Sequence, residues 1–199
     1  MVFENILDYK TLEKKSHLLL IYTIILTSIS IFVAYYLFDQ NASVVFLFLM
    51  TISASHIVYN ELREEEIEDE KDPFIDNAFW KRNEKIIKIY CVLFFGCIIS
   101  VAFWHSILNQ SQSDKIFNSQ INTIQNIQNT NRNSLNATAN SIADKTLFFV
   151  IIKNNIIVMT LAFLFSFVFG SGALYIIFWN ASVIGIFISQ SAAKIGVIG

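Results

Sequence analysis

The chain is poor in proline, cysteine and charge. One Pro and two Cys stand among its 199 residues, and charged residues make up 15%. So few prolines leave long helices uninterrupted, as suits a chain packed in lipid. Cys91 and Cys97 fall in the same apolar stretch, on different sides of the helix it predicts. We therefore interpret both as small buried apolar groups, and not as a disulfide or a metal site.

Signatures of nucleic-acid binding and catalysis are also missing. The net charge is −2, and the Lys and Arg residues are scattered along the chain. There is no glycine-rich phosphate loop, no nucleophile elbow and no His-Glu-x-x-His motif, and His17, His56 and His105 stand far apart. We therefore predict no nucleic-acid partner, no cofactor, no metal and no enzymatic activity.

What the chain does contain is long apolar stretches. Hydrophobic residues make up 54% of it, and the stretches are apolar on all sides over far more than the ~10 residues of a barrel strand. A lipid environment leaves helices as the remaining way to satisfy the backbone. The predicted fold class is therefore all-α: a polytopic transmembrane bundle of about five membrane helices, with a polar extracytoplasmic insertion that is either helical or disordered.

Five stretches are expected to cross the membrane. The first, Leu18 to Phe38, covers the ~30 Å hydrocarbon layer at about 1.5 Å per residue. The stretches pair into a hairpin over 18–59, a single helix over 86–104 and a second hairpin over 146–189, whose helices are joined by Gly170-Ser171-Gly172. The tail, 190–199, is too short to cross, and we expect the end at Gly199 to mark a truncated or partial protein.

The distribution of Lys and Arg predicts the orientation. Basic residues concentrate in the N-terminal segment, 1–17, and around the connection 60–85, whereas few occur in the connection 105–145 and in the tail. The positive-inside rule then places the N-terminus and residues 60–85 in the cytoplasm and residues 105–145 outside. The predicted location is the cell membrane, with several spans.

The two polar connections differ in character. Residues 61–72 read ELREEEIEDEKD, which predicts a solvated continuation of the second helix as far as Pro73, or a docking surface for a basic partner. Phe79 and Trp80 precede several basic residues, a pattern typical of a segment that returns to anionic lipid.

The outer connection, 105–145, is mostly Asn, Gln, Ser and Thr, a bias that often means disorder. One heptad-like register nevertheless joins its apolar residues, which predicts a helical face in need of a partner. The members of this face are Phe117, Ile121, Ile124, Leu135 and Ile142. Asn109 and Asn136 begin triplets that match the glycosylation acceptor.

Polar residues inside the last two apolar stretches are the candidate functional positions. They are Lys153, Asn154, Asn155 and Asn180. Polar groups exposed to lipid are costly, so these side chains should be paired. Three interpretations stay open: amide cross-links between helices with Lys153 reaching the interface, residues 146–155 lying along the outer interface before the chain turns inward, or a polar cavity between the last two helices.

The same region resembles the membrane domain of the stage II sporulation protein M family. The resemblance rests on Asn154-Asn155 opening a long apolar helix, on FGSG at 169–172, and on Asn180 and Gly185 in IIFWNASVIG. Here Asn180-Ala181 replaces the family's Asn-Gly. The resemblance implies a polytopic membrane protein without catalysis of its own, whose sporulation member acts with cell-wall hydrolases, and it makes Gly170, Gly172 and Gly185 candidate hairpin glycines.

Three functional hypotheses follow. The leading one is a non-enzymatic membrane scaffold that assembles envelope-associated or other extracytoplasmic partners through residues 105–145. The alternative is a permease-like transporter subunit with its polar site at Lys153, Asn154, Asn155 and Asn180. The third is an architectural protein that forms homo-oligomers through its helices in the lipid bilayer.

Overall fold

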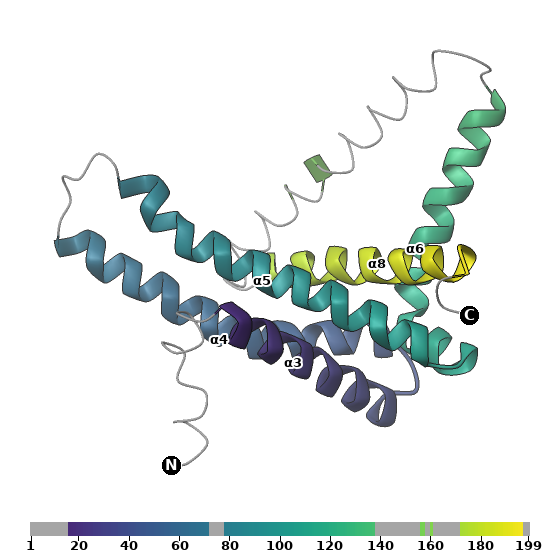
Figure 1. The fold of residues 1–199 in the computed structure, drawn as a ribbon, viewed down its shortest axis with the longest axis horizontal. Helices are drawn as coiled ribbons and strands as arrows, with labels where there is room; N and C mark the ends of the chain where they lie inside the picture. Colours follow the sequence, from purple (N-terminus) through teal and green to yellow (C-terminus); the bar gives the residue numbers. More distant parts are fainter. Residues whose placement is uncertain (1–15, 72–77, 138–155, 158–159, 161–171, 197–199) are drawn as a thin grey trace.

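The computed structural model describes residues 16–71, 78–137, 156–157, 160 and 172–196, and within these ranges it is helical without strands. Five helices make up this part: α3 Ser16–Leu37, α4 Ala42–Lys71, α5 Ala78–Ile107, α6 Gln110–Ala137 and α8 Gly172–Lys194 (Figure 1). The predicted all-α fold class is therefore confirmed.

Four of these helices are long and apolar enough to cross a membrane. The qualifying segments are Ser16–Leu37, Ala42–Asn60, Glu84–Ile107 and Gly172–Lys194, with mean hydropathies between 1.8 and 2.4. Length and composition thus indicate a multi-pass membrane protein. The further predicted span, 146–169, lies outside the described residues apart from 156–157 and 160.

The membrane helices form a bundle with α5 between α3 and α8. Helix α5 packs against both neighbours, and α4 covers α3 and α8 from the other side. Trp104 of α5 contacts Ser28 of α3, and Ser100 contacts Ile24 one turn earlier on both helices. Cys97 and His105 meet Phe178 and Ser189 of α8 in the same order. Helices α3, α5 and α8 therefore run parallel, and α4 runs back beside them.

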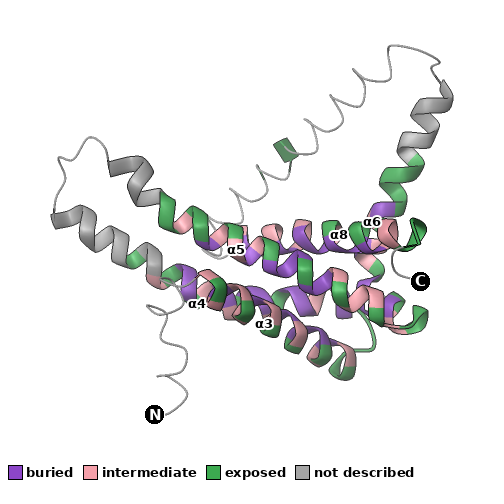
Figure 2. Cartoon of the chain, in the orientation of Figure 1, coloured by how far each residue is buried: buried purple, intermediate pink, exposed green. Residues whose placement is uncertain are grey.

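The inward-facing side of α3 is lined with small hydroxyl residues. Thr23 and Thr27 are fully buried, and their hydroxyl groups donate to the carbonyl oxygens of Leu19 and Thr23, at 2.8 and 2.7 Å. Hydrogen bonding within the helix satisfies these groups where no water is available. The opposite face carries exposed Ile21, Ile25 and Ile29, and Figure 2 shows the buried residues gathered between the helices.

Two glycines allow close approach of α5 to its neighbours. A Cβ atom added at Gly96 would lie 2.8 Å from Thr23 Cβ, and one added at Gly185 would lie 2.9 Å from the carbonyl oxygen of Ile98. Small residues at such crossings bring backbones together, which is how membrane helices gain packing energy without a hydrophobic driving force.

The two cysteines do not share one environment. Cys97 is buried, as predicted, whereas Cys91 is exposed on the outside of α5. The prediction that both are buried is therefore wrong for Cys91. Its position follows from the helical period, which turns Cys91 towards the lipid-facing side of α5 when Cys97 faces α8.

Helices α4 and α5 continue beyond their apolar segments at the end of the bundle away from α6 (Figure 1). Helix α4 runs on through the acidic stretch to Lys71, so the predicted helical continuation is confirmed up to that residue. Helix α5 already begins at Ala78, before the predicted start of its span. Polar helix ends of this kind need no membrane to satisfy their backbones, because each bond is made within the helix.

Candidate functional site

Helix α6 begins at a capped N-terminus just after α5. The side chain of Asn109 accepts a hydrogen bond from the backbone N–H of Gln112 at 2.9 Å, and Gln112 Oε1 accepts one from the N–H of Asn109 at 3.3 Å. This reciprocal pair satisfies free N–H groups at the start of the helix. Of the two alternatives for the polar insertion, the structure therefore shows a helix as far as Ala137.

The first half of α6 packs onto the end of the bundle. Phe117 is fully buried, with its ring centroid 5.8 Å from that of Phe46 and 5.9 Å from that of His105. Ile124 is also buried and Ile121 is half-buried. The predicted apolar face is thus confirmed over these three residues, and its partner is the membrane bundle itself. The side chain of Leu135 and all of Ile142 lie outside what the structure describes.

A kink separates the start of α6 from the rest of the helix. Phe117 has φ −114° and ψ 15°, which are not helical values. Residues on both sides of the kink, as far as Ile124, stay against the bundle, and the helix beyond them rises away from the membrane helices (Figure 1). Phe117, the residue with the non-helical backbone angles, is therefore also a fully buried anchor of α6.

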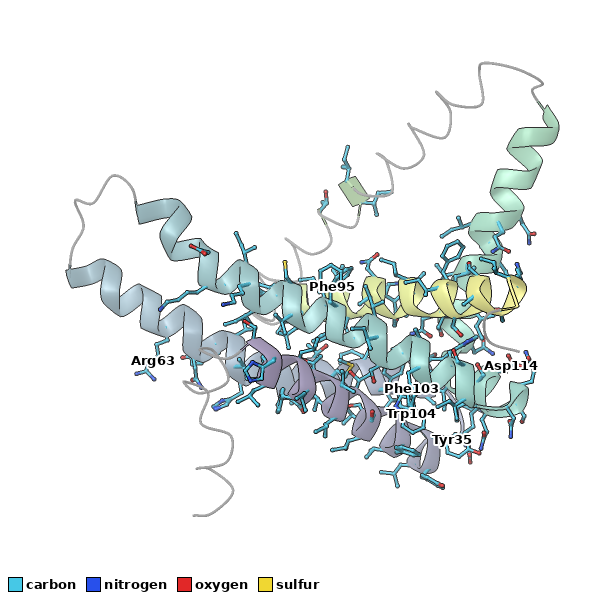
Figure 3. The ribbon with its side chains drawn as sticks, viewed as in Figure 1. Tyr35, Arg63, Phe95, Phe103, Trp104 and Asp114 are labelled. Atoms are coloured by element: carbon cyan, nitrogen blue, oxygen red, sulfur yellow. The ribbon has the colours of Figure 1, made fainter. Side chains whose placement is uncertain are left out.

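Polar contacts fasten α6 to the turn between α3 and α4. Lys115 Nζ lies 2.9 Å from Asp39 Oδ1 and 4.7 Å from the ring centroid of Tyr35. Further along, Ser119 and Ser43 share a hydrogen bond of 2.7 Å between their hydroxyl groups. Figure 3 places Tyr35, Trp104 and Asp114 together at this end of the bundle, and Arg63 at the other. Helix α6 is therefore attached by both its apolar face and its polar flank.

Beneath α6, a polar cluster joins α5 to α8. His105 Nδ1 lies 2.8 Å from Ser189 Oγ, and Ser189 Oγ lies 2.9 Å from Ser106 Oγ. Ser106 donates its proton to the carbonyl oxygen of Ala102 at 2.7 Å. A hydroxyl has one proton, so Ser106 accepts from Ser189, and Ser189 in turn accepts from the Nδ1–H of His105.

The direction of these bonds determines what the cluster can do. Because His105 Nδ1 is a donor, it cannot take a proton from Ser189, and the arrangement does not match a serine nucleophile with its base. The series of hydrogen bonds ends at the carbonyl oxygen of Ala102, which has no proton to pass on. The bonds therefore hold α5 against α8 and do not form a path for proton transfer. In the described parts of the chain, no group of three His, Cys, Asp or Glu side chains is placed to hold a metal ion.

Those residues predicted as functional from the sequence that the structure describes lie outside this cluster. Asn180 is half-buried in α8, and its Nδ2 donates to the carbonyl oxygen of Ile176 at 2.7 Å. This bond stays within one helix. Gly172 is the buried first residue of α8, and Gly185 faces α5 in the middle of that helix. Lys153, Asn154, Asn155 and Gly170 lie outside the described residues.

Comparison of the chain with models of known protein families, with curated proteins and with solved structures finds no match. The resemblance to the stage II sporulation protein M family therefore stays a prediction from the residues that carry it. Function has to be argued from the geometry of this site.

Sequence reasoning missed the residues that join the elements at this site. Ser189 and Ser106 read as ordinary small residues of apolar helices, and Gln120 as part of a polar tract. Yet Ser189 and Gln120 are buried, and Gln120 Nε2 reaches the carbonyl oxygen of Ser43 at 3.4 Å. The only sequence signal was the spacing of Gln120 from Phe117 and Ile124, which puts it on the same helix face.

Proposed function

We propose that this protein is a non-enzymatic membrane scaffold that presents α6 to extracytoplasmic, envelope-associated proteins. The observation that carries the proposal is the division of α6 into two halves. Its first half is held by contacts with α3, α4 and α8, whereas residues 125–129 beyond the last buried position are all exposed. A helix anchored in this way presents its outer half in a defined direction.

The exposed segment 125–129 has the surface chemistry of a binding site for protein. Gln125, Gln128 and Asn129 in this segment are exposed, so they offer amide donors and acceptors around one large apolar side chain, Ile127, which is 52% exposed. Such a surface recognises a partner through hydrogen bonds and one apolar contact, without charge. Protein is thus the partner that it fits best.

The side of the membrane follows from the basic residues. The turn at Asp39 and the start of α6 meet at one end of the bundle, through the ion pair with Lys115. The connections assigned to this end carry few Lys and Arg, whereas the ends of α4 and α5 opposite carry many. The positive-inside rule therefore supports an outward-facing α6. The resemblance to the stage II sporulation protein M family agrees with a role beside envelope enzymes.

The test is to alter the exposed half of α6 and measure which proteins co-purify. In the variant Ile127→Glu/Gln128→Glu, we expect the recovery of extracytoplasmic proteins from native membranes in mild detergent to fall about tenfold, the effect of losing roughly 1.4 kcal/mol of binding free energy. Glu is a good helix former, so α6 should stay helical. Quantitative mass spectrometry gives the recovery of each protein.

A matched control makes the same charge change on the anchored half of α6. Ser111→Glu/Asn118→Glu also adds two acids at exposed positions, and it should leave the recovered proteins unchanged. Equal recovery in both variants and the unaltered chain would contradict the scaffold proposal. Recovery of a cytoplasmic ATPase at fixed stoichiometry, with no extracytoplasmic protein, would replace it with the permease-like alternative.

A further inference from the structure

A cavity of about 280 Å³ opens between the ends of α5 and α8, beside the polar cluster. It is lined by His105, Ser106, Ser189, Gln190, Ala193 and Lys194. Sites for whole drug-sized ligands start at about 300 Å³, so this cavity has room for a small polar group and not for a large molecule. The scaffold proposal makes no use of it.

The hydrogen bonds already described decide which charge the cavity favours. Ser106 donates its proton to the carbonyl oxygen of Ala102 and Ser189 donates its proton to Ser106, so neither hydroxyl can donate into the cavity. The free donors are the ammonium group of Lys194 and the side-chain amide of Gln190. No acidic side chain is among the six lining residues. The cavity therefore favours an anion that accepts hydrogen bonds from Lys194 and Gln190.

Exposed apolar residues are next to the lining residues in the sequence. Ile107 follows Ser106 on α5 and is 60% exposed, Ile188 of α8 precedes Ser189 and is 47% exposed, and Ile195, directly after α8, is 76% exposed. All three occur where the apolar spans end. A ligand with a charged head and apolar tails can thus place its head in the cavity and its tails along these side chains.

From this combination we propose that the cavity binds the phosphate group of an anionic phospholipid. Lys194 and Gln190 hold the phosphate oxygens, and Ile107, Ile188 and Ile195 contact the acyl chains. A basic side chain at the end of a membrane helix attracts the negatively charged head group of such a lipid. Asp114 of α6 is exposed and accepts hydrogen bonds from Gln110, and it is not among the residues that line the cavity.

The test measures lipid binding by native mass spectrometry of the purified full-length chain in mild detergent. Titration with dihexanoyl phosphatidylglycerol should give saturable binding, with at least about tenfold weaker binding of dihexanoyl phosphatidylcholine and of inorganic phosphate. Equal binding of inorganic phosphate would overturn the lipid assignment in favour of a free anion. Equal binding of the phosphatidylcholine would overturn the selection for an anionic head.

Two variants locate the site. Lys194→Gln removes the charge, and Ala193→Phe fills the cavity without changing any charge. Both residues are exposed, so the bundle should fold in each variant. We expect each to weaken phosphatidylglycerol binding about tenfold.

The control is Lys88→Gln, which removes an exposed cation from the other end of α5. It should leave the affinity unchanged. An equal loss in this control, or unchanged affinity in Ala193→Phe, would show that the lipid binds by surface charge alone and would overturn the site.

Discussion

Buried polar groups in this bundle are almost all small hydroxyls. Thr51, like Thr23 and Thr27, donates to the carbonyl oxygen of the residue four positions earlier, at 2.7 Å. Hydroxyl groups that satisfy themselves in this way let helices approach closely without leaving unpaired donors in lipid. The exception in size is Gln120, whose Nε2 lies 3.4 Å from the carbonyl oxygen of Ser43. The partly buried Trp104 donates from Nε1 across the bundle to Ser28 Oγ at 2.8 Å.

At this scale, Gly185 is a position where side-chain size is tightly restricted. A side chain there meets the backbone oxygen of Ile98 and the Cβ atom of Val101, at 2.9 and 3.1 Å, and backbone cannot move aside cheaply. We expect Gly185→Val to destabilise the bundle by roughly 1–3 kcal/mol. Thermal unfolding in detergent, followed by circular dichroism, should show a lower Tm.

The neighbouring residue provides the control. Ile184 is exposed on α8, so Ile184→Val should leave the Tm nearly unchanged. If the two variants unfold at the same temperature, α5 and α8 are not as closely packed at Gly185 as the structure indicates.

Helix α6 is the element whose stability depends most on its surroundings. It is largely polar, and an isolated helix of such a sequence would be marginal in water. Packing on the bundle provides the stabilisation that the polar sequence of α6 does not provide by itself. The residues buried there include Ile116, Phe117 and Ile124. The ion pair between Lys115 and Asp39 adds little, because the Asp39 side chain is 97% exposed.

The variant Phe117→Ala should therefore release α6 from the bundle. Loss of a buried Phe costs about 3–5 kcal/mol, well above the cost of losing an exposed ion pair. We expect amide hydrogen exchange over residues 110–124 to accelerate at least tenfold while the membrane spans stay protected, as followed by mass spectrometry.

Asp39→Asn is the comparison variant for this element. It removes the ion pair with Lys115 and should change the exchange rates by no more than a few-fold, since an exposed pair is worth about 0–1 kcal/mol. Similar acceleration in both variants would mean that polar contacts, and not the burial of Phe117, hold α6.

The molecule as a whole has two different ends. One end gathers the α3–α4 turn, the start of α6 and the end of α8, while the other carries the long polar extensions of α4 and α5 (Figure 1). Ser111 is exposed at the first end and Arg63 at the second. The orientation predicted from Lys and Arg therefore assigns these two residues to opposite sides of the membrane.

Single-cysteine labelling tests that orientation. In a background of Cys91→Ser and Cys97→Ala, we expect Ser111→Cys to react with a membrane-impermeant thiol reagent in intact cells, and Arg63→Cys to react only after permeabilisation. Gel-shift or mass spectrometry reads the labelling. Reaction of Arg63→Cys alone in intact cells would reverse the orientation and, with it, the side on which α6 could meet partners.

The sequence by itself determined the helical class and the approximate limits of the apolar helices. The predicted stretches 18–38, 44–59, 86–104 and 173–189 each lie within, or within one residue of, a helical segment that is long and apolar enough to cross a membrane. These helices could be predicted because a long run of apolar residues indicates a membrane helix whatever other parts of the chain pack against it. The face of α6 over Phe117, Ile121 and Ile124 was readable for the same reason.

Only the tertiary structure decided which helices are neighbours and what meets between them. The contact of His105 with Ser189, the attachment of Lys115 to Asp39 and the cavity beside Lys194 join residues far apart in the chain. The sequence around these residues does not predict the contacts, since a serine in an apolar helix has the same sequence context whether it faces lipid or a histidine. Packing of α5 against α8, and of α6 on the end of the bundle, places them together.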